Sequence, residues 1–185
     1  MAEGSSPVKV LETDRLILCE MSVEDADFIL EIVNEPAFLQ FIGDRGVRTI
    51  EEARRYIREG PIDSYKRHGF GLYLTKLKDE EAPIGICGLI KRESLDDVDI
   101  GFAFSSRFWG KGYAVEAASA VMSYGRSAFG LDRIVAIVSP ENSSSKKVLE
   151  KLGMRIERMV KMPGDDEEIE LYAGEVSESP RDRAR

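Results

Sequence analysis

The sequence predicts a single α/β domain in which three layers form around a mixed sheet, and three observations support this class. Short apolar runs alternate with helical patterns in the order β-α-α-β-β-β-α-β-α-β-β. The length of 185 residues suits one domain with a core of its own. Hydrophobic residues make up 43% of the chain and charged residues 32%, which is the usage of an ordinary globular protein.

Periodicity and turn signals place the expected elements. Strands are expected at residues 15–21, 70–76, 83–90, 100–104, 133–138, 154–162 and 167–172. Helices are expected at residues 23–33, 37–41, 50–58, 61–68, 113–129 and 142–152. Ser22 with Asp25, and Thr49 with Glu52, have the spacing of helix N-caps and support two of the helix starts. The Gly-Pro pair at 60–61 is expected to interrupt the helical path.

The two ends of the chain lack the patterns of its middle. We expect a flexible tail at residues 1–9, the domain at 10–174, and a charged, disordered tail at 175–185. The N-terminus has neither the charged nor the apolar region of a signal peptide. Apolar runs stay well below the ~20 residues of a membrane span. These features predict a cytoplasmic protein with no membrane partner.

The net charge and the scarcity of metal-binding side chains argue against a nucleic-acid partner and against a metal site. The formal net charge of −8 argues against nucleic acid as a partner and is compatible with an amine or cationic one. Cys19 and Cys87 lie in apolar runs, where cysteine is usually a small buried hydrophobe. His68 is the single histidine, and we expect a surface histidine or one with its hydrogen bonds satisfied, and not a catalytic one. Because no His, Cys and carboxylate cluster has ligand spacing, we expect no metal.

The stretch 99–129 carries the strongest functional signal. Its loop at 105–112 joins a strand to a long helix and supplies Arg107, Gly110 and Gly112 as R-x-x-G-x-G. Such a loop aims backbone N–H groups and a helix N-terminus at one point, which suits a phosphate or pyrophosphate. A plain turn is the alternative. Spacing excludes both a P-loop and a dinucleotide fingerprint.

The run R-F-W-G-K-G-Y-A-V-E-A resembles the acetyl-CoA pyrophosphate loop of the GCN5-related N-acetyltransferases (GNAT), [RQ]-x-x-G-x-[GA]. Its form is that of the branch of ribosomal-protein alanine N-acetyltransferases (RimJ/RimL-like), as are the opening L-E-T-D-R-L-I-L and the following V-E-D-A. The resemblance covers residues 11 to about 173. It implies a three-layer GNAT fold with helices on both faces. It also implies a mostly antiparallel sheet that is splayed beside the loop to admit the pantetheine arm.

The resemblance implies acetyl-CoA as co-substrate and places its contacts in three segments. The expected contacts are Phe102, Ala103, Phe104, Arg107, Phe108, Trp109, Gly110, Lys111, Gly112, Tyr113, Ala114, Asn142 and Ser145. The backbone at 102–104 would pair with the pantetheine amides, although sheet core alone also explains these residues. Lys111 would add positive charge toward the phosphates.

Three residues are the catalytic candidates that the resemblance implies. Asn142 and Ser145 match the N-x-x-S of this branch, in which Asn142 would orient the arm and Ser145 would protonate the leaving thiolate. Helix capping is the alternative for Asn142. Asp99 is the candidate base. The alternative for this residue is a solvated carboxylate at a strand end, and a water chain could accept the proton in its place. Glu116 matches the glutamate of Y-A-x-E-A and is expected only to brace the loop.

These observations predict an acetyl-CoA-dependent N-acetyltransferase that transfers directly to a primary amine, with no covalent intermediate. The acceptor is a protein N-terminus or a small-molecule amine, and the sequence does not choose between them. A non-catalytic acyl-CoA-binding sensor or scaffold is the alternative from another class. The resemblance assigns part of the acceptor wall to the region between the first two expected strands. Both a monomer and a homodimer are compatible with the sequence.

Overall fold

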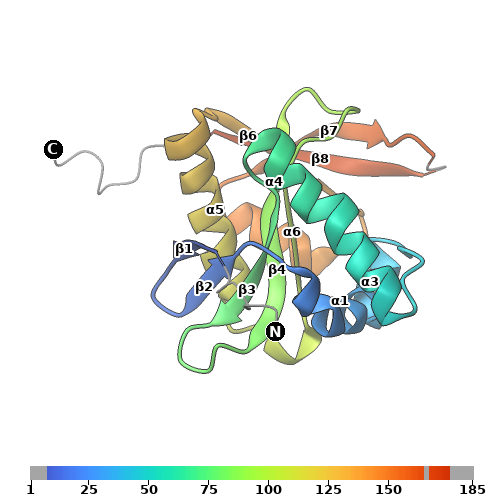
Figure 1. Cartoon of the computed structure of the whole chain (residues 1–185). Helices are drawn as coiled ribbons and strands as arrows, with labels where there is room; N and C mark the ends of the chain where they lie inside the picture. Colours follow the sequence, from blue (N-terminus) through green and yellow to red (C-terminus); the bar gives the residue numbers. More distant parts are fainter. Residues whose placement is uncertain (1–7, 165–166, 176–185) are drawn as a thin grey trace, which may run out of the picture.

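One eight-stranded sheet organises the computed structural model, which describes residues 8–164 and 167–175 (Figure 1). Its order is β1-β2-β3-β4-β5-β6-β8-β7, and among these neighbours only β5 and β6 run parallel. The strands are β1 Lys9–Glu12, β2 Leu16–Cys19, β3 Leu72–Leu77, β4 Pro83–Ile90, β5 Val98–Phe104, β6 Arg133–Val138, β7 Arg155–Lys161 and β8 Glu168–Glu175. The mixed, mostly antiparallel sheet confirms the predicted fold class.

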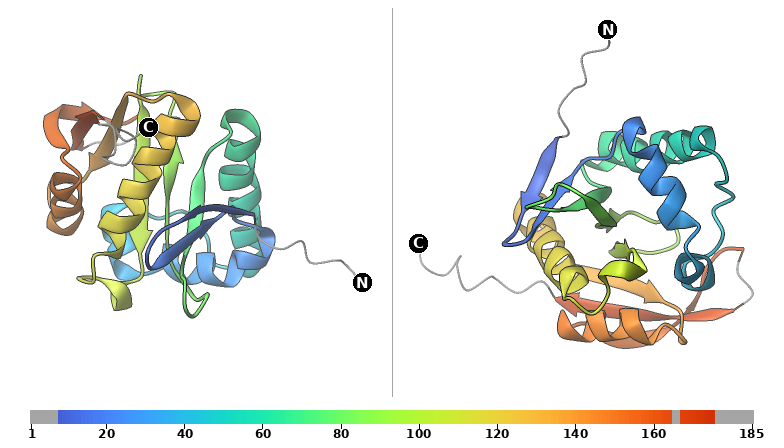
Figure 2. Two further views of the ribbon diagram at one scale, coloured as in Figure 1. Left: turned by 90° about the vertical axis from the view of Figure 1, so that its left-hand side faces the viewer. Right: turned by 90° about the horizontal axis from the view of Figure 1, so that it is seen from below.

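Helices cover both faces of the sheet, as the right-hand view of Figure 2 shows. They are α1 Ala26–Val33, α2 Pro36–Phe41, α3 Ile50–Ile57, α4 Asp63–His68, α5 Tyr113–Phe129 and α6 Ser143–Lys151. One apolar cluster packs α5 against β2, β4, β5 and β6, and a second packs α1, α2 and α3 against β3 and β4. Neighbouring residues of β3 divide between them, since Tyr73 belongs to the first cluster and Leu74 to the second.

Local signals account for many of the boundaries. Ser22 with Asp25, and Thr49 with Glu52, form complete capping boxes, and α5 begins and ends where the sequence predicted. The α-helix is interrupted at 60–61 as predicted, although the chain stays helical there. A π-helical segment, Arg58–Ile62, contains both residues and joins α3 to α4.

The N-terminal end of the domain differs from the prediction. Strand β1 begins at Lys9, inside the predicted tail, and pairs with β2. At the other end β8 includes Glu175, the first residue of the predicted C-terminal tail. The remaining parts of the two predicted tails, 1–7 and 176–185, lie outside the described residues. Short polar-flanked strands such as β1 give little periodic signal, because four residues cover only two alternations.

The sheet opens between β5 and β6. These strands pair only at Val98 with Ile134 and at Asp99 with Val135, although β5 continues to Phe104 and β6 to Val138. The opposite edge of β5 stays paired with β4 along its length. Beyond Asp99, therefore, half of the β5 backbone groups face the opening without a strand partner. None of the described helices is both long and apolar enough to cross a membrane.

Candidate active site

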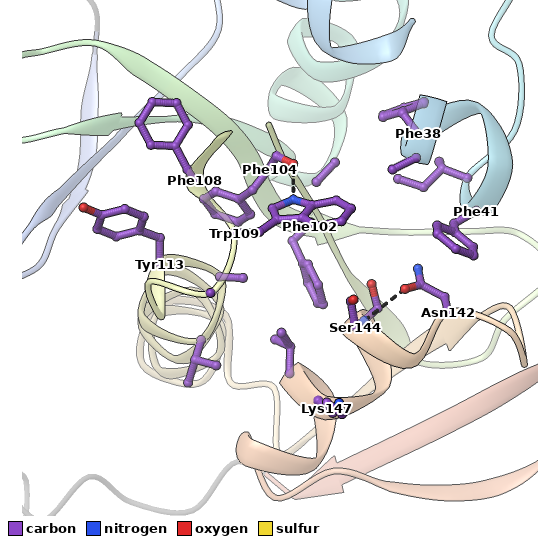
Figure 3. A pocket seen from close by; sticks show the side chains of 18 of the residues that line it. Phe38, Phe41, Phe102, Phe104, Phe108, Trp109, Tyr113, Asn142, Ser144 and Lys147 are labelled. Carbon is purple, nitrogen blue, oxygen red and sulfur yellow. Dashed lines mark hydrogen bonds between the residues drawn. The ribbon is translucent and has the colours of Figure 1, made fainter. Parts of the chain in front are cut away.

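Two cavities meet at the opening between β5 and β6, and Figure 3 shows the side chains that line the first of them. The first has a volume of about 280 Å³ and lies between α2, the end of β5, the glycine loop and α6. The second, of about 590 Å³, lies among β5, β6, α2 and the loop that follows α2. Both are lined by Phe38, Phe41, Ile42, Phe102, Ala103, Asn142 and Ser145. A molecule in one cavity would therefore meet a molecule in the other at these side chains.

The loop between β5 and α5 has the backbone that its sequence predicted. Gly110 and Gly112 have φ angles of +75° and +82°, which glycine adopts without the strain that other residues suffer. Both glycines also line the first cavity. The indole N–H of Trp109 donates to the Phe104 carbonyl at 2.7 Å and ties the loop back to β5 (Figure 3).

Most of the predicted acetyl-CoA contacts line the first cavity. They are Phe102, Ala103, Phe104, Phe108, Trp109, Gly110, Gly112, Tyr113, Ala114, Asn142 and Ser145. Two predicted contacts, Arg107 and Lys111, line neither cavity. The Arg107 guanidinium pairs with Glu31 at 2.7 Å, and the Lys111 ammonium lies 5.4 Å from the centre of the Phe108 ring. The structure therefore gives no support to the predicted cofactor contacts of these two side chains.

Sequence reasoning missed two faces of the first cavity. One comes from the end of α1 and from α2, and includes Phe38 and Phe41. The other is a face of α6 formed by Ser144, Lys147, Val148 and Lys151. These α6 residues have helical i, i+3, i+4, i+7 spacing counted from Ser144, so helical periodicity could have shown that they share one face. Their two lysines supply positive charge that the prediction had assigned to Lys111.

Asn142 and Ser145 lie where both cavities meet. Asn142 is the N-cap of α6, and its Oδ1 accepts the Ser145 N–H at 3.0 Å, which confirms the capping interpretation. Its amide nitrogen has no hydrogen-bond partner in the part of the chain that the structure describes. The same holds for the Ser145 hydroxyl. Both groups thus remain able to donate to a molecule in the cavities.

Asp99 lies at the last paired position of β5 and β6, in the wall of the second cavity. Its predicted alternative as a solvated carboxylate was wrong, because Asp99 is only 1% exposed. Oδ2 accepts from the Arg92 Nε at 2.6 Å, whereas Oδ1 is buried without a hydrogen-bond partner among the described residues. Burial raises the pKa of Asp99 to about 6, although the Arg92 charge opposes that rise.

The second cavity is lined by both polar and apolar groups. Arg45, Tyr56 and Arg92 line it together with Asp99. Burial raises the pKa of the Tyr56 phenol, and the charges of Arg45 and Arg92 oppose that rise. Asp44 also lines the cavity but pairs with Arg48, which compensates its charge.

The remaining residues that the sequence singled out lie outside both cavities. Glu116 lines neither cavity and bonds instead to the segment before β2. Cys19 and Cys87 are buried thiols, and burial raises the pKa of both. His68 is exposed at the end of α4, as predicted. Across residues 8–164 and 167–175, no group of three or more His, Cys, Asp and Glu side chains has the arrangement of a metal site.

Comparisons with known proteins agree with this geometry. Residues 15–155 match the model of the acetyltransferase (GNAT) domain. The uncharacterized N-acetyltransferase YnaD of Bacillus subtilis (strain 168) is 31% identical over 151 residues, which are 82% of this chain and 85% of YnaD.

Two solved structures share the fold. The GNAT-family acetyltransferase from Bacillus anthracis is 28% identical, with a TM-score of 0.76 over 91% of this chain and 99% of that one. RimL, a ribosomal L7/L12 alpha-N-protein acetyltransferase solved in complex with coenzyme A, is 19% identical, with a TM-score of 0.77 over 90% of this chain and 97% of RimL. The chain therefore belongs to the GNAT family and is an N-acetyltransferase of that family.

Proposed function

We propose that this protein transfers the acetyl group of acetyl-CoA directly to a primary amine, on a protein N-terminus or a small molecule. The first cavity and the glycine loop would hold the pantetheine arm and the pyrophosphate, and the second cavity would hold the acceptor. One observation carries the proposal: the two cavities meet at the open edge of β5. That arrangement lets both substrates be present together, which supplies rate through proximity.

On the donor side, the proposed roles follow from unpaired backbone and side-chain groups. An N–H of β5 beyond Asp99 faces the opening and is available to the oxygen of a thioester. Ser145 has a hydroxyl with which to protonate the departing thiolate, and Asn142 has an amide nitrogen with which to hold the arm. Both residues begin α6, whose N-terminus favours a developing negative charge.

On the acceptor side, Asp99 is the proposed base. A pKa of about 6 leaves it ionised at neutral pH, so it can accept a proton from the amine. Both carboxylate oxygens are covered, Oδ2 by Arg92 and Oδ1 by the surrounding chain. Proton transfer to Asp99 would therefore need one of these oxygens to be uncovered when the amine binds, and a water chain in place of Asp99 is the alternative base.

The test is thiol release from acetyl-CoA with a panel of peptides, polyamines, aminoglycosides and amino acids, combined with mass spectrometry of the products. We expect at least one amine to accelerate thiol release and to gain an acetyl group. Protein without amine gives the background rate. CoA binding with no amine-dependent thiol release across the panel would instead favour the non-catalytic sensor. Failure to bind CoA would contradict both readings.

A further inference from the structure

Arg15, which lies outside both cavities, contacts the glycine loop directly. Its Nη1 donates to the backbone carbonyl of Lys111 at 2.9 Å. Its guanidinium carbon also lies 4.5 Å from the centre of the Tyr113 ring, within the range of a cation–π contact. Arg15 follows β1 in the chain and is 96 residues before Lys111. The N-terminal hairpin is thereby connected to the loop that the pyrophosphate would occupy.

Glu116 fixes the Arg15 guanidinium in this position. Nε and Nη2 of Arg15 reach Glu116 Oε2 at 2.7 Å and 2.6 Å, and the Arg15 backbone N–H donates to Oε1 at 2.9 Å. The Thr13 hydroxyl donates to the same Oε1 at 2.6 Å. Burial works to raise the pKa of Glu116, but the bonds from Thr13 and Arg15 outweigh it and hold the pKa below its usual value. Glu116 therefore stays ionised at neutral pH and anchors Arg15 to the first turn of α5.

The geometry of the peptide between Lys111 and Gly112 lets the Arg15 contact orient a backbone N–H. In a planar trans peptide the C=O and the N–H point in opposite directions, so the bond from Arg15 to the Lys111 carbonyl also fixes the N–H of Gly112. That N–H then points away from Arg15. Gly110 and Gly112 have large conformational freedom, so the loop without this contact would sample other directions.

We propose that Arg15 is a positioning residue, which holds the Gly112 N–H toward the pyrophosphate of acetyl-CoA. The proposal rests on the proposed function, because it takes the glycine loop as the pyrophosphate site. A Cβ at Gly112 would lie in ordinary contact with the Arg15 Nη2, at 3.4 Å, which places the guanidinium beside this glycine.

The test compares CoA with pantetheine, which lacks the pyrophosphate, by NMR titration of ¹⁵N-labelled protein. The variants are Arg15→Lys, which keeps the charge but loses the planar fork, and Glu116→Gln, which keeps the shape but loses the charge. Lys9→Gln is the matched control, because it breaks an ion pair with Glu12 on the same hairpin. Thermal unfolding establishes that each protein is folded.

We expect Arg15→Lys to raise the Kd for CoA about tenfold and Glu116→Gln about threefold, with the Gly112 amide resonance displaced in both. The Kd for pantetheine should stay within about twofold of the wild type, as should both constants in the control. Equal losses for CoA and pantetheine, or an unchanged Kd for CoA in both folded variants, would overturn the positioning role. Wild-type protein that binds neither ligand would contradict the proposed function itself.

Discussion

The proposed donor and acceptor sides of the site are built in different ways. The glycine loop on the donor side is one contiguous stretch, and polar bonds hold it at both ends, from Trp109 to β5 and from Arg15 to Lys111. The second cavity is instead assembled from many separate segments, among them α2, α3, β4, β5, β6 and α6, which present both apolar and polar groups. Its polar groups include the ion pair of the buried Asp99 with the partly buried Arg92.

That difference reflects what each side has to recognise. A pyrophosphate can be bound by backbone N–H groups, and their direction depends on local φ angles and a few anchoring bonds. An acceptor amine carries no such common group, so side chains from distant segments must shape its cavity. Substitutions in the glycine loop should therefore weaken CoA binding. Single substitutions on the acceptor side should instead lower the rate of transfer and leave CoA binding intact.

The largest expected effect is on the donor side. Gly112→Asp adds a side chain where φ is +82° and where the nearest neighbour is the Arg15 guanidinium, and it also places negative charge near the pyrophosphate. We expect the Kd for CoA to rise at least about 100-fold, equivalent to about 3 kcal/mol, in calorimetric titration. Circular dichroism should show a folded protein. An unchanged affinity would mean that the loop is only a turn.

A smaller effect is expected where the two sides meet. Ser145→Ala should lower kcat by about 10- to 100-fold, the low end for a general acid, because the α6 N-terminus still stabilises the thiolate. The KM for acetyl-CoA should change little, since the hydroxyl acts mainly in the transition state. Asn142→Ala should instead raise that KM. Steady-state kinetics on the acceptor from the panel separates the two, and an intact kcat in Ser145→Ala would assign the proton to another donor.

The smallest effect concerns Asp99 on the acceptor side and depends on pH. With a pKa of about 6, Asp99 loses its ionised form as the pH falls below 6, so kcat/KM should fall about tenfold per pH unit there. Asp99→Asn should remove this acid limb and lower kcat/KM about tenfold at pH 7. An acid limb that persists in a folded Asp99→Asn variant would assign the base to another group.

The same carboxyl should affect stability with the opposite sign. The raised pKa means that the folded protein binds this proton more tightly than the unfolded chain does. The contribution of Asp99 to stability is therefore full below about pH 4 and is lost as the pH rises toward 6. Chemical unfolding at a series of pH values should show this loss in the wild type relative to Asp99→Asn.

The sequence predicted the donor side better because its signal is local. The positions of Gly110 and Gly112 follow from a short motif, and α5 from the periodicity after it. The structure does not place the Arg107 and Lys111 side chains in the cavities, because a charge near a motif does not fix where a long side chain points. The burial of Asp99 was also missed, since the pairing of β5 with β6 and the bond to Arg92 depend on tertiary structure.

Local sequence patterns could not predict which residues line the proposed acceptor cavity. Phe38 and Phe41 are apolar positions of a short helix, and nothing near them in sequence indicates that they line both cavities. Strand β1 gave too few residues for a period, although it leads directly to Arg15. The positions of these residues and of β1 depend on contacts between segments far apart in the chain.

Initial-rate kinetics with both substrates varied tests the central claim most directly. If the two cavities hold donor and acceptor together, double-reciprocal plots against acetyl-CoA at several fixed acceptor concentrations should intersect, because transfer takes place in a ternary complex. No acetylated protein should accumulate when acetyl-CoA is supplied alone. Parallel lines together with an acetyl-enzyme detected by mass spectrometry would contradict direct transfer at the opening between β5 and β6.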